Sequence, residues 1–194
     1  MTEARKEFWK ALRARHPHLR EALAADAQLT AHYRGERDRF RSRPDLAVQC
    51  VRLACVSDAF LGQALYRLKA RLQALGIPLL PRLAHRLAMA VAQISVGDPV
   101  VLHPGVYVLH GQIVVDGLVE IHPGVTIAPF VTIGLKAGDP RGATIERDVS
   151  IGTGAKVIGP VRIGAGATIG ANAVVVTDVP AGATVAGIPA RPIR

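Results

Sequence analysis

Aliphatic residues recur every six positions in the second half of the chain. Ten side chains share this spacing: Val115, Ile121, Ile127, Ile133, Ile145, Ile151, Val157, Ile163, Ile169 and Val175. A six-residue step turns about 600° on an α-helix, so it cannot keep one helical face apolar. The spacing instead predicts a coil of short strands, each of which points one aliphatic side chain inwards and ends at a corner of small or polar residues.

The first half follows the three-or-four spacing of helices. Short helices are expected over 6–15 and 19–33, a long one from after Pro44 to about Leu75, and another from Pro81 to about Gln93. The long helix is predicted to present one apolar face, formed by Val51, Ala54, Cys55, Leu61, Leu65, Leu68 and Leu72. We therefore divide the chain near Ile94 into a helical domain, 1–93, and a repeat domain, 94–194.

Composition follows the same division. Residues 1–92 carry 17 Lys and Arg against 8 Asp and Glu, while residues 93–194 carry 7 of each. Glycine numbers 3 in the first part and 16 in the second, as helices and turns respectively require. The arginines between Arg34 and Arg43 are interpreted as a solvated linker, because no nucleic-acid-binding signature accompanies them. Nucleic acid is therefore not an expected partner.

The remaining composition favours a cytoplasmic protein. No apolar stretch resembles a membrane span, and the N-terminus has no apolar core of a secretory signal. Cys50 and Cys55 lie five residues apart, which fits neither a CxxC redox pair nor a zinc ligand set, so they are expected to be reduced core residues.

The six-residue spacing breaks twice. From Val108 to Val115 the step is seven residues, so one extra residue falls near His110. After Ile133 the next step would reach Asp139, which cannot be an interior aliphatic, so Leu135 to Thr144 is predicted to be an expelled loop. Interruptions of a regular scaffold are where functional loops concentrate, and both breaks are candidate sites.

These patterns resemble those of a known enzyme family. The six-residue repeat and the ending Val185-Ala-Gly-Ile-Pro-Ala-Arg191 are similar to the left-handed parallel β-helix acyltransferases. The succession of Leu102-His-Pro-Gly105, Leu109-His-Gly111, the loop and Ile151-Gly-Thr-Gly-Ala-Lys-Val-Ile-Gly159 resembles the serine O-acetyltransferases. This resemblance implies an α+β chain, with helices followed by a left-handed β-helix. It also implies acetyl-CoA as co-substrate, serine as acceptor in cysteine biosynthesis, and a homotrimer or dimer of trimers.

The resemblance also implies roles for individual residues. His110 matches the catalytic histidine, which would act as general base. Asp98 is the candidate carboxylate to orient it, with Asp116 the second choice there and a candidate for substrate binding. Arg141 would hold a substrate carboxylate. Turn residues one coil apart would face the cofactor's pantetheine arm, and a step of three repeat units selects Leu135, Thr153 and Ala171; Lys156 would meet its phosphates.

Other interpretations remain open at this point. Leu109 precedes His110 where the family has Asp, and Gly142 follows Arg141 where it has His, so the acceptor is either serine or another hydroxyl or amine, such as a sugar or a specialised amino acid. A zinc site of His103, His110 and His122, as in carbonic anhydrases, is a remote alternative, as is a non-catalytic scaffold; no metal is expected. Family members that dock into their partner synthase end in isoleucine, whereas this sequence ends Ile193-Arg194, so such docking is not expected.

Overall fold

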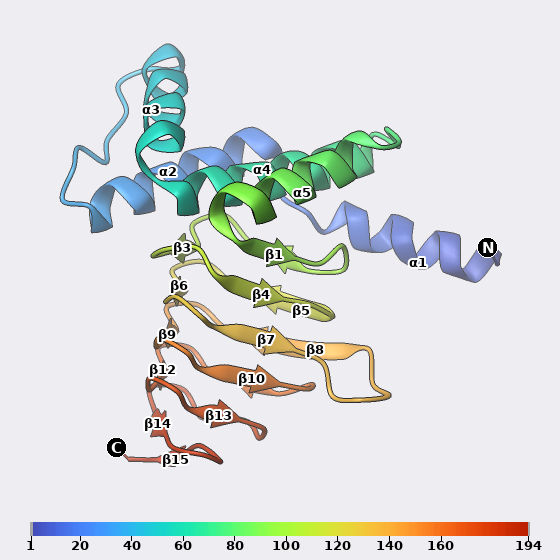
Figure 1. The fold of residues 1–194 in the computed structure, drawn as a ribbon, viewed down its shortest axis with the longest axis vertical. Helices are drawn as coiled ribbons and strands as arrows, with labels where there is room; N and C mark the ends of the chain where they lie inside the picture. The colour runs from blue at the N-terminus through green and yellow to red at the C-terminus, as the bar shows by residue number, and fades with distance from the viewer. Residues whose placement is uncertain (1, 194) are drawn as a thin grey trace.

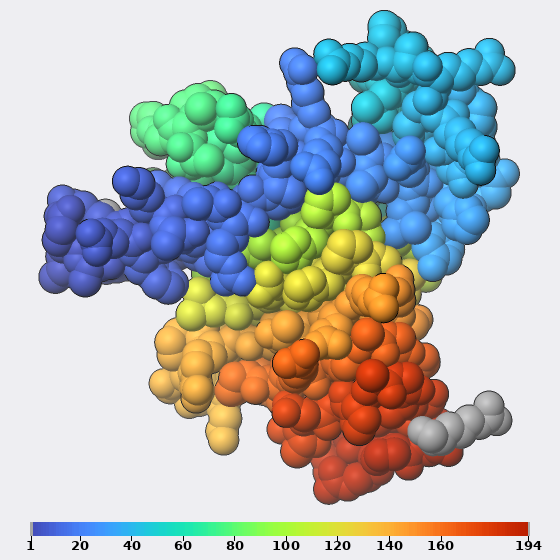
Figure 2. Space-filling model, turned by 180° about the vertical axis from the view of Figure 1, so that it is seen from behind, coloured from blue at the N-terminus to red at the C-terminus, as the bar shows by residue number. Residues whose placement is uncertain are grey.

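The structure is a computed structural model that describes residues 2–193, and it consists of helices stacked on one end of a three-sided coil of strands (Figure 1). The helices are α1 (Glu3–Ala14), α2 (Leu19–Tyr33), α3 (Arg43–Val56), α4 (Asp58–Ala74) and α5 (Leu80–Ala92). Seen from behind, α1 reaches out to one side and α3 rises at the other, so the helical part is wider than the coil beneath it (Figure 2).

Three parallel sheets form the sides of the coil. The first contains β1 (Ile94–Val96), β4 (Ile113–Val115), β7 (Thr132–Gly134), β10 (Lys156–Ile158) and β13 (Val174–Val175). The second contains β2 (Val101–Leu102), β5 (Leu118–Ile121), β8 (Arg141–Ile145) and β11 (Arg162–Ile163). The third contains β3 (Tyr107–Val108), β6 (Thr126–Ile127), β9 (Ser150–Ile151), β12 (Thr168–Ile169), β14 (Thr184–Ala186) and the antiparallel β15 (Arg191–Pro192).

The six-residue lattice lines the interior of this coil. All ten lattice side chains are at most 1% exposed, and successive coils stack them directly, as in the pairing of Ile121 with Ile145 and of Ile145 with Ile163. Burial of these β-branched side chains is the main apolar contribution to the fold. The predicted succession of a helical part and a hexapeptide β-helix is confirmed.

The expelled loop is shorter than the sequence indicates. It comprises residues 135–140 and projects between β7 and β8 (Figure 1), whereas Arg141 already belongs to β8, where it pairs with Leu118 of β5. Ile133 pairs with Val157 and Val157 with Val175, so the coil that contains the loop is one hexapeptide longer than the coil that follows it. A step of three repeat units therefore does not stay on one corner when it crosses this loop.

Polar side chains of α4 close the upper end of the coil. Carbonyls of each coil accept hydrogen bonds from the coil above, as Val115 does from the amide of Gly97 at 2.8 Å. The first coil has no coil above it, so its carbonyls need other donors. Four residues of α4 supply them: Gln63 to Val106 (2.9 Å), Tyr66 to Val100 (2.6 Å), Lys69 to Val96 (2.6 Å) and Arg67 to His103 (2.7 Å).

The predicted long helix and its apolar face are both wrong in detail. Ser57 has an extended backbone and divides the segment into α3 and α4, and its hydroxyl accepts a hydrogen bond from the amide of Phe60 at 3.2 Å. Serine is a favoured N-cap, which explains the new helix start. Leu68 is exposed because α4 buries the opposite face, whose polar side chains contact the β-helix, and Val51, which belongs to α3, is exposed as well.

The structure also bears on the two cysteines and on the search for a membrane-spanning helix. Cys55 is exposed rather than part of the core, whereas Cys50 is half-buried and packs beside Phe60; both are free thiols. None of the helices within residues 2–193 is long and apolar enough to cross a membrane.

Candidate active site

His110 stands at a corner that differs from those below it. Val108 pairs with Ile127 before this corner, and Val115 pairs with Ile133 after it. The segment from Val108 to Val115 is therefore one residue longer than the paired segment below it, and Gln112 takes a positive φ of 65° within it. The His110 imidazole is exposed as a result.

Gly111 allows this corner to meet the end of α5. A Cβ atom on Gly111 would lie 1.7 Å from the carbonyl oxygen of Ala92, a distance that no side chain could occupy. The amide of Gln112 donates to the same oxygen at 3.1 Å. The β-helix corner and the helical part are thus joined directly beside His110.

A crevice of about 320 Å³ opens beside His110. Its walls are the α3–α4 junction with Val56, Ser57 and Asp58, the end of α5 with Val91 to Gln93, and Arg34 at the end of α2. Asp58 and Arg34 bring opposite charges to the same space as the imidazole. The guanidinium of Arg34 also donates to Glu36 at 2.9 Å.

Asp58 is the functional candidate that the sequence interpretation missed. A continuous helix through residue 57 would have placed Asp58 in mid-helix, with no relation to His110. The available signal was the Ser57-Asp58 pair, because a serine N-cap followed by an acidic residue is typical of a helix start.

The two carboxylates proposed from the sequence lie at another corner. Asp98 follows β1 and pairs with the Lys69 ammonium at 3.1 Å, while Asp116 follows β4 and accepts the amide of Gly117 at 2.9 Å. Burial alone would raise the pKa of Asp98, but the Lys69 charge and hydrogen bonds from Gln73 and Lys69 hold it below its ordinary value. Within one chain neither carboxylate is brought to His110, which lies between β3 and β4.

The expected cofactor column is only partly assembled. Thr153 and Ala171 stack on the corner that carries His110, as the pairing of Ile151 with Ile169 requires. Leu135 lies at a different corner, after β7, because the regular step that selected it crosses the expelled loop. The residue stacked with Thr153 is instead Pro129, one coil earlier, as the pairing of Ile127 with Ile151 shows. The column beneath His110 is therefore Pro129, Thr153 and Ala171.

Lys156 and Arg141 have different surroundings. Lys156 begins β10 beside this corner, and its ammonium donates to the carbonyl of Phe130 at 2.7 Å. Arg141 folds back on its own loop, where it donates to Asp139 at 2.7 and 3.0 Å. The hydrogen bonds from Arg141 lower the pKa of Asp139 to about 2. Arg141 does not reach the His110 crevice within one chain.

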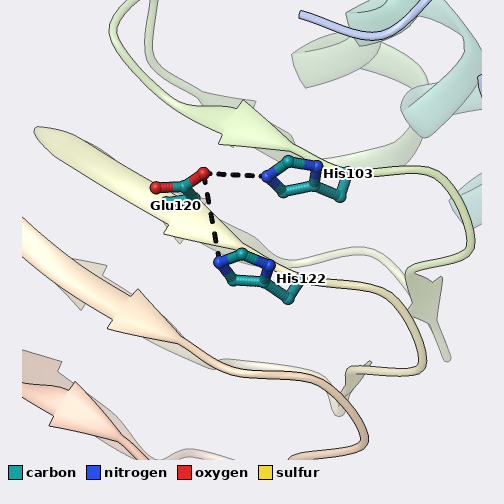
Figure 3. Close-up of side chains that lie close together, drawn as sticks. All are labelled: His103, Glu120 and His122. Atoms are coloured by element: carbon teal, nitrogen blue, oxygen red, sulfur yellow. Dashed lines mark hydrogen bonds and ion pairs between the residues drawn. The ribbon is translucent and has the colours of Figure 1, made fainter. Parts of the chain in front are cut away.

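The three-histidine zinc site is not formed. His103 follows β2 and His122 follows β5, so the two lie one above the other on the same corner of successive coils. His110 follows β3 and lies on the next corner. Glu120, which the sequence interpretation did not consider, joins the two histidines there (Figure 3).

Comparisons with known proteins agree with this architecture. The family model described as bacterial transferase hexapeptide (six repeats) matches residues 142–177. A serine acetyltransferase of Bacillus licheniformis is 41% identical over 128 residues, which cover 57% of this chain and 59% of the relative. One from Mycobacterium tuberculosis is 42% identical over 121 residues, which cover 58% and 52%. The chain thus spans little more than half the length of these curated relatives.

Solved structures extend the similarity to the helical part. Soybean serine acetyltransferase complexed with serine is 27% identical, with a TM-score of 0.74 over 90% of this chain and 69% of that one. The Brucella abortus serine acetyltransferase in complex with coenzyme A is 26% identical, with a TM-score of 0.74 over 89% and 66%. The chain therefore resembles serine acetyltransferases in sequence over a little more than half of its length and in fold over about nine-tenths of it.

Proposed function

We propose that this protein transfers the acetyl group of acetyl-CoA to the hydroxyl of L-serine, giving O-acetylserine for cysteine biosynthesis. The observation that carries the proposal is the position of His110. An exposed imidazole stands at the irregular corner, beside a crevice, in a chain that resembles serine acetyltransferases. Relatives solved with serine and with coenzyme A support these two substrates.

The charges of the crevice suit a free amino acid. An amino acid carries an ammonium and a carboxylate on one carbon, and Asp58 and Arg34 offer a carboxylate and a guanidinium at the same crevice. Arginine matches a carboxylate through two parallel donors. We assign the ammonium of the acceptor to Asp58 and its carboxylate to Arg34, which leaves the hydroxyl to approach His110.

The proposed reaction is a direct transfer. A ring nitrogen of His110 takes the hydroxyl proton as the serine oxygen bonds to the thioester carbonyl carbon. The carbon–sulfur bond then breaks, and the imidazolium returns its proton to the departing thiolate of coenzyme A. An imidazole suits both steps because its ordinary pKa lies near neutral pH.

The cofactor would lie along the corner beneath His110. Pro129, Thr153 and Ala171 are small enough for the pantetheine arm to approach the backbone closely, and Lys156 lies beside this column. Exchange of its contact with the Phe130 carbonyl for a phosphate of coenzyme A would replace a neutral acceptor by a charged one, which forms a stronger hydrogen bond.

A second acceptor class has one observation in its favour. Leu109 lines the crevice next to His110, where the resemblance leads one to expect a carboxylate. An apolar residue there favours an acceptor with an apolar group near its hydroxyl or amine, such as a larger amino acid or a sugar derivative. If the acceptor is an amino acid, Asp58 would bind its ammonium in place of the carboxylate that is missing at Leu109.

A thiol-release assay with acetyl-CoA and single acceptors tests both proposals. L-Serine, L-threonine, L-homoserine and a set of hexoses would be compared. We expect L-serine to give the highest kcat/KM, and transfer only to another acceptor would replace serine by that class. If none of these acceptors causes coenzyme A to be released, the protein is not an acetyltransferase that acts on amino acids or sugars.

His110→Ala is the decisive variant. We expect turnover to fall by about 10²–10⁴-fold, the usual contribution of general base catalysis. His18→Ala, at an exposed position ahead of α2, is the matched control and should keep full activity. Equal Tm values for both variants and the parent would show that folding is intact, and unchanged turnover in His110→Ala would remove the mechanism.

The assembly and location are part of the same proposal. We infer a homotrimer, or a dimer of trimers through the helices, in which the crevice of one subunit is completed by residues 135–140 and Arg141 of its neighbour. The helical domain, 1–93, would then serve assembly and supply Arg34 and Asp58 to the crevice, while the β-helix, 94–194, would supply His110 and the cofactor corner. Two free thiols support a cytoplasmic location. The expectation of no synthase docking rests on Arg194, which lies outside the described residues.

A further inference from the structure

Two histidines and a glutamate converge on the second sheet, at a corner other than that of His110. Glu120 and His122 are two positions apart at the end of β5, so they point to the same outer face. His103 follows β2, the strand above, and its ring stacks on that of His122 with centroids 4.6 Å apart. Both Nε2 atoms point at one carboxylate oxygen (Figure 3).

The distances are those of a nearly formed ligand set. His103 Nε2 lies 2.8 Å from Glu120 Oε1, and His122 Nε2 lies 3.9 Å from the same oxygen. All three candidate ligand atoms are within 4.8 Å of one another. Around a tetrahedral zinc ion with bonds of about 2.0–2.1 Å, ligand atoms would be about 3.3 Å apart. Reaching that geometry requires the 2.8 Å separation to lengthen by about 0.5 Å and the 3.9 Å separation to shorten by about 0.6 Å, changes that small side-chain rotations can make.

We propose that His103, Glu120 and His122 bind one divalent transition-metal ion, with zinc the preferred ion. Two imidazoles and one carboxylate are ligands that zinc accepts, whereas calcium and magnesium prefer oxygen alone. Three protein ligands leave a fourth position for water, which can reach the site because all three side chains are only partly buried.

Neighbouring side chains hold the carboxylate in place. The other oxygen of Glu120 pairs with Arg15, in the segment after α1, and this contact holds Oε1 toward the histidines. Partners of this kind orient metal ligands in known sites. Nearby Glu146 is engaged by Arg162 and does not compete for the imidazoles.

An ion there would connect three parts of the chain. His103 belongs to the first coil and His122 to the second, while Arg15 brings the end of α1 to the same carboxylate. The site would therefore stabilise the upper coils and the position of α1. It does not take part in the acetyl transfer proposed above, because His110 lies at a different corner.

Zinc chloride titrated into the full-length, tag-free, chelator-treated protein tests the proposal by calorimetry. We expect saturation at one ion per chain and a Tm higher by about 5–10 °C at a hundredfold excess over Kd. His122→Asn should lower the affinity at least about tenfold and remove the shift. This side chain is only partly buried and makes no closer contact with Glu120 than 3.9 Å, and its remaining contact is the stacking on the His103 ring, so its loss should leave the fold intact.

His32→Gln is the matched control. His32 also lies beside a carboxylate, at 3.1 Å from Asp38, but it has no second histidine near it. The control should bind zinc like the parent. Absence of saturable binding in the parent, or equal affinity in His122→Asn and the parent, would overturn the site. Acetyl transfer measured in the same samples should be unaffected by His122→Asn, which separates this result from the proposed enzyme activity.

Discussion

At the residue scale, His16 is a half-buried imidazole whose Nδ1 has no hydrogen-bond partner within residues 2–193. This nitrogen is inaccessible to solvent, and the ring lies near Tyr66. Burial first, and then the charges of Arg67, Lys69 and Arg15, lower its pKa to about 4. The folded protein therefore holds His16 neutral under conditions in which the unfolded chain would protonate it.

The sign of the resulting pH dependence follows from this difference. The pKa of His16 is about 4 in the folded state and 6.5 in the unfolded state, so the unfolded state binds more protons between these values. Its contribution to stability is complete above pH 6.5 and declines as the pH falls toward 4. His16→Phe keeps an aromatic ring and removes the titration. When the pH falls from 6.5 to 5, we expect the free energy of unfolding to decrease by about 1 kcal/mol less in the variant than in the parent. This figure allows for the partial exposure of His16.

Urea unfolding at pH 6.5 and at pH 5 measures this difference. His18→Phe introduces the same ring two residues away at an exposed position, and it should retain the pH dependence of the parent. Stability curves of His16→Phe and parent that run parallel between the two pH values would show that His16 does not titrate in this range.

Some of the site could be read from single residues and some could not. The extra residue near His110 is visible as a seven-residue step in the sequence, and the structure places it at a corner. The neighbours of His110 were not visible, because they depend on where three separate helices end. Asp98 was selected because it precedes His110 closely in the sequence. In a three-sided coil, however, the residues that share a corner are one full coil apart, and Asp98 and His110 fall on different corners.

At the scale of elements, α4 takes the place of a missing coil. Its inward face carries Gln63, Tyr66, Arg67 and Lys69, which donate to the carbonyls of the first coil. Arg67 is balanced by Asp26 of α2, with Nε at 2.9 Å from Oδ2, and Asp26 also accepts the amide of Gly105 at 2.9 Å. The polar groups are thus buried in pairs, as a stable interior requires.

Gln63→Met tests this capping role. Methionine matches the shape of glutamine but cannot donate, so the buried carbonyl of Val106 would lose its partner. We expect a loss of about 1–3 kcal/mol in the free energy of unfolding, measured in urea. Gln28→Met, on the exposed side of α2, should change it by less than about 0.5 kcal/mol. Equal stability of the two variants would mean that α4 covers the coil by packing alone.

The same element explains where prediction from the sequence succeeded and failed. The β-helix was predictable because each of its interior residues obeys one local rule of spacing. The buried face of α4 was not, since the need for polar donors arises from the open end of the coil, which lies elsewhere in the sequence. Leu135 was misplaced for a related reason: residues 135–140 lengthen one coil, and the spacing rule does not apply across them.

At the scale of the whole molecule, α5 buries its small apolar residues and exposes its large ones, the opposite of the usual arrangement in a helix that packs on a core. It buries Pro81, Ala84, Ala88 and Ala92 and packs against α4 with this face. Its larger residues, Leu80, Leu83, Leu87 and Val91, lie along the opposite side and are each at least 38% exposed. Exposed apolar rows of this kind are typical of surfaces that contact another protein chain. We take the partner to be the α5 helix of a second subunit, within the dimer of trimers proposed above.

Leu83→Glu combined with Leu87→Glu tests that contact. The charges would have to be buried without partners in a helix-to-helix interface, whereas they cost little on a solvated face. We expect the double variant to sediment as a trimer where the parent sediments as a hexamer, with acetyl transfer retained because the crevice, as proposed above, is completed within one trimer. Val48→Glu, a similarly exposed aliphatic on α3, should leave the mass unchanged. A double variant that keeps the mass of the parent would show that the leucine row serves another purpose, and a monomeric parent would remove the proposal that a neighbouring subunit completes the active site.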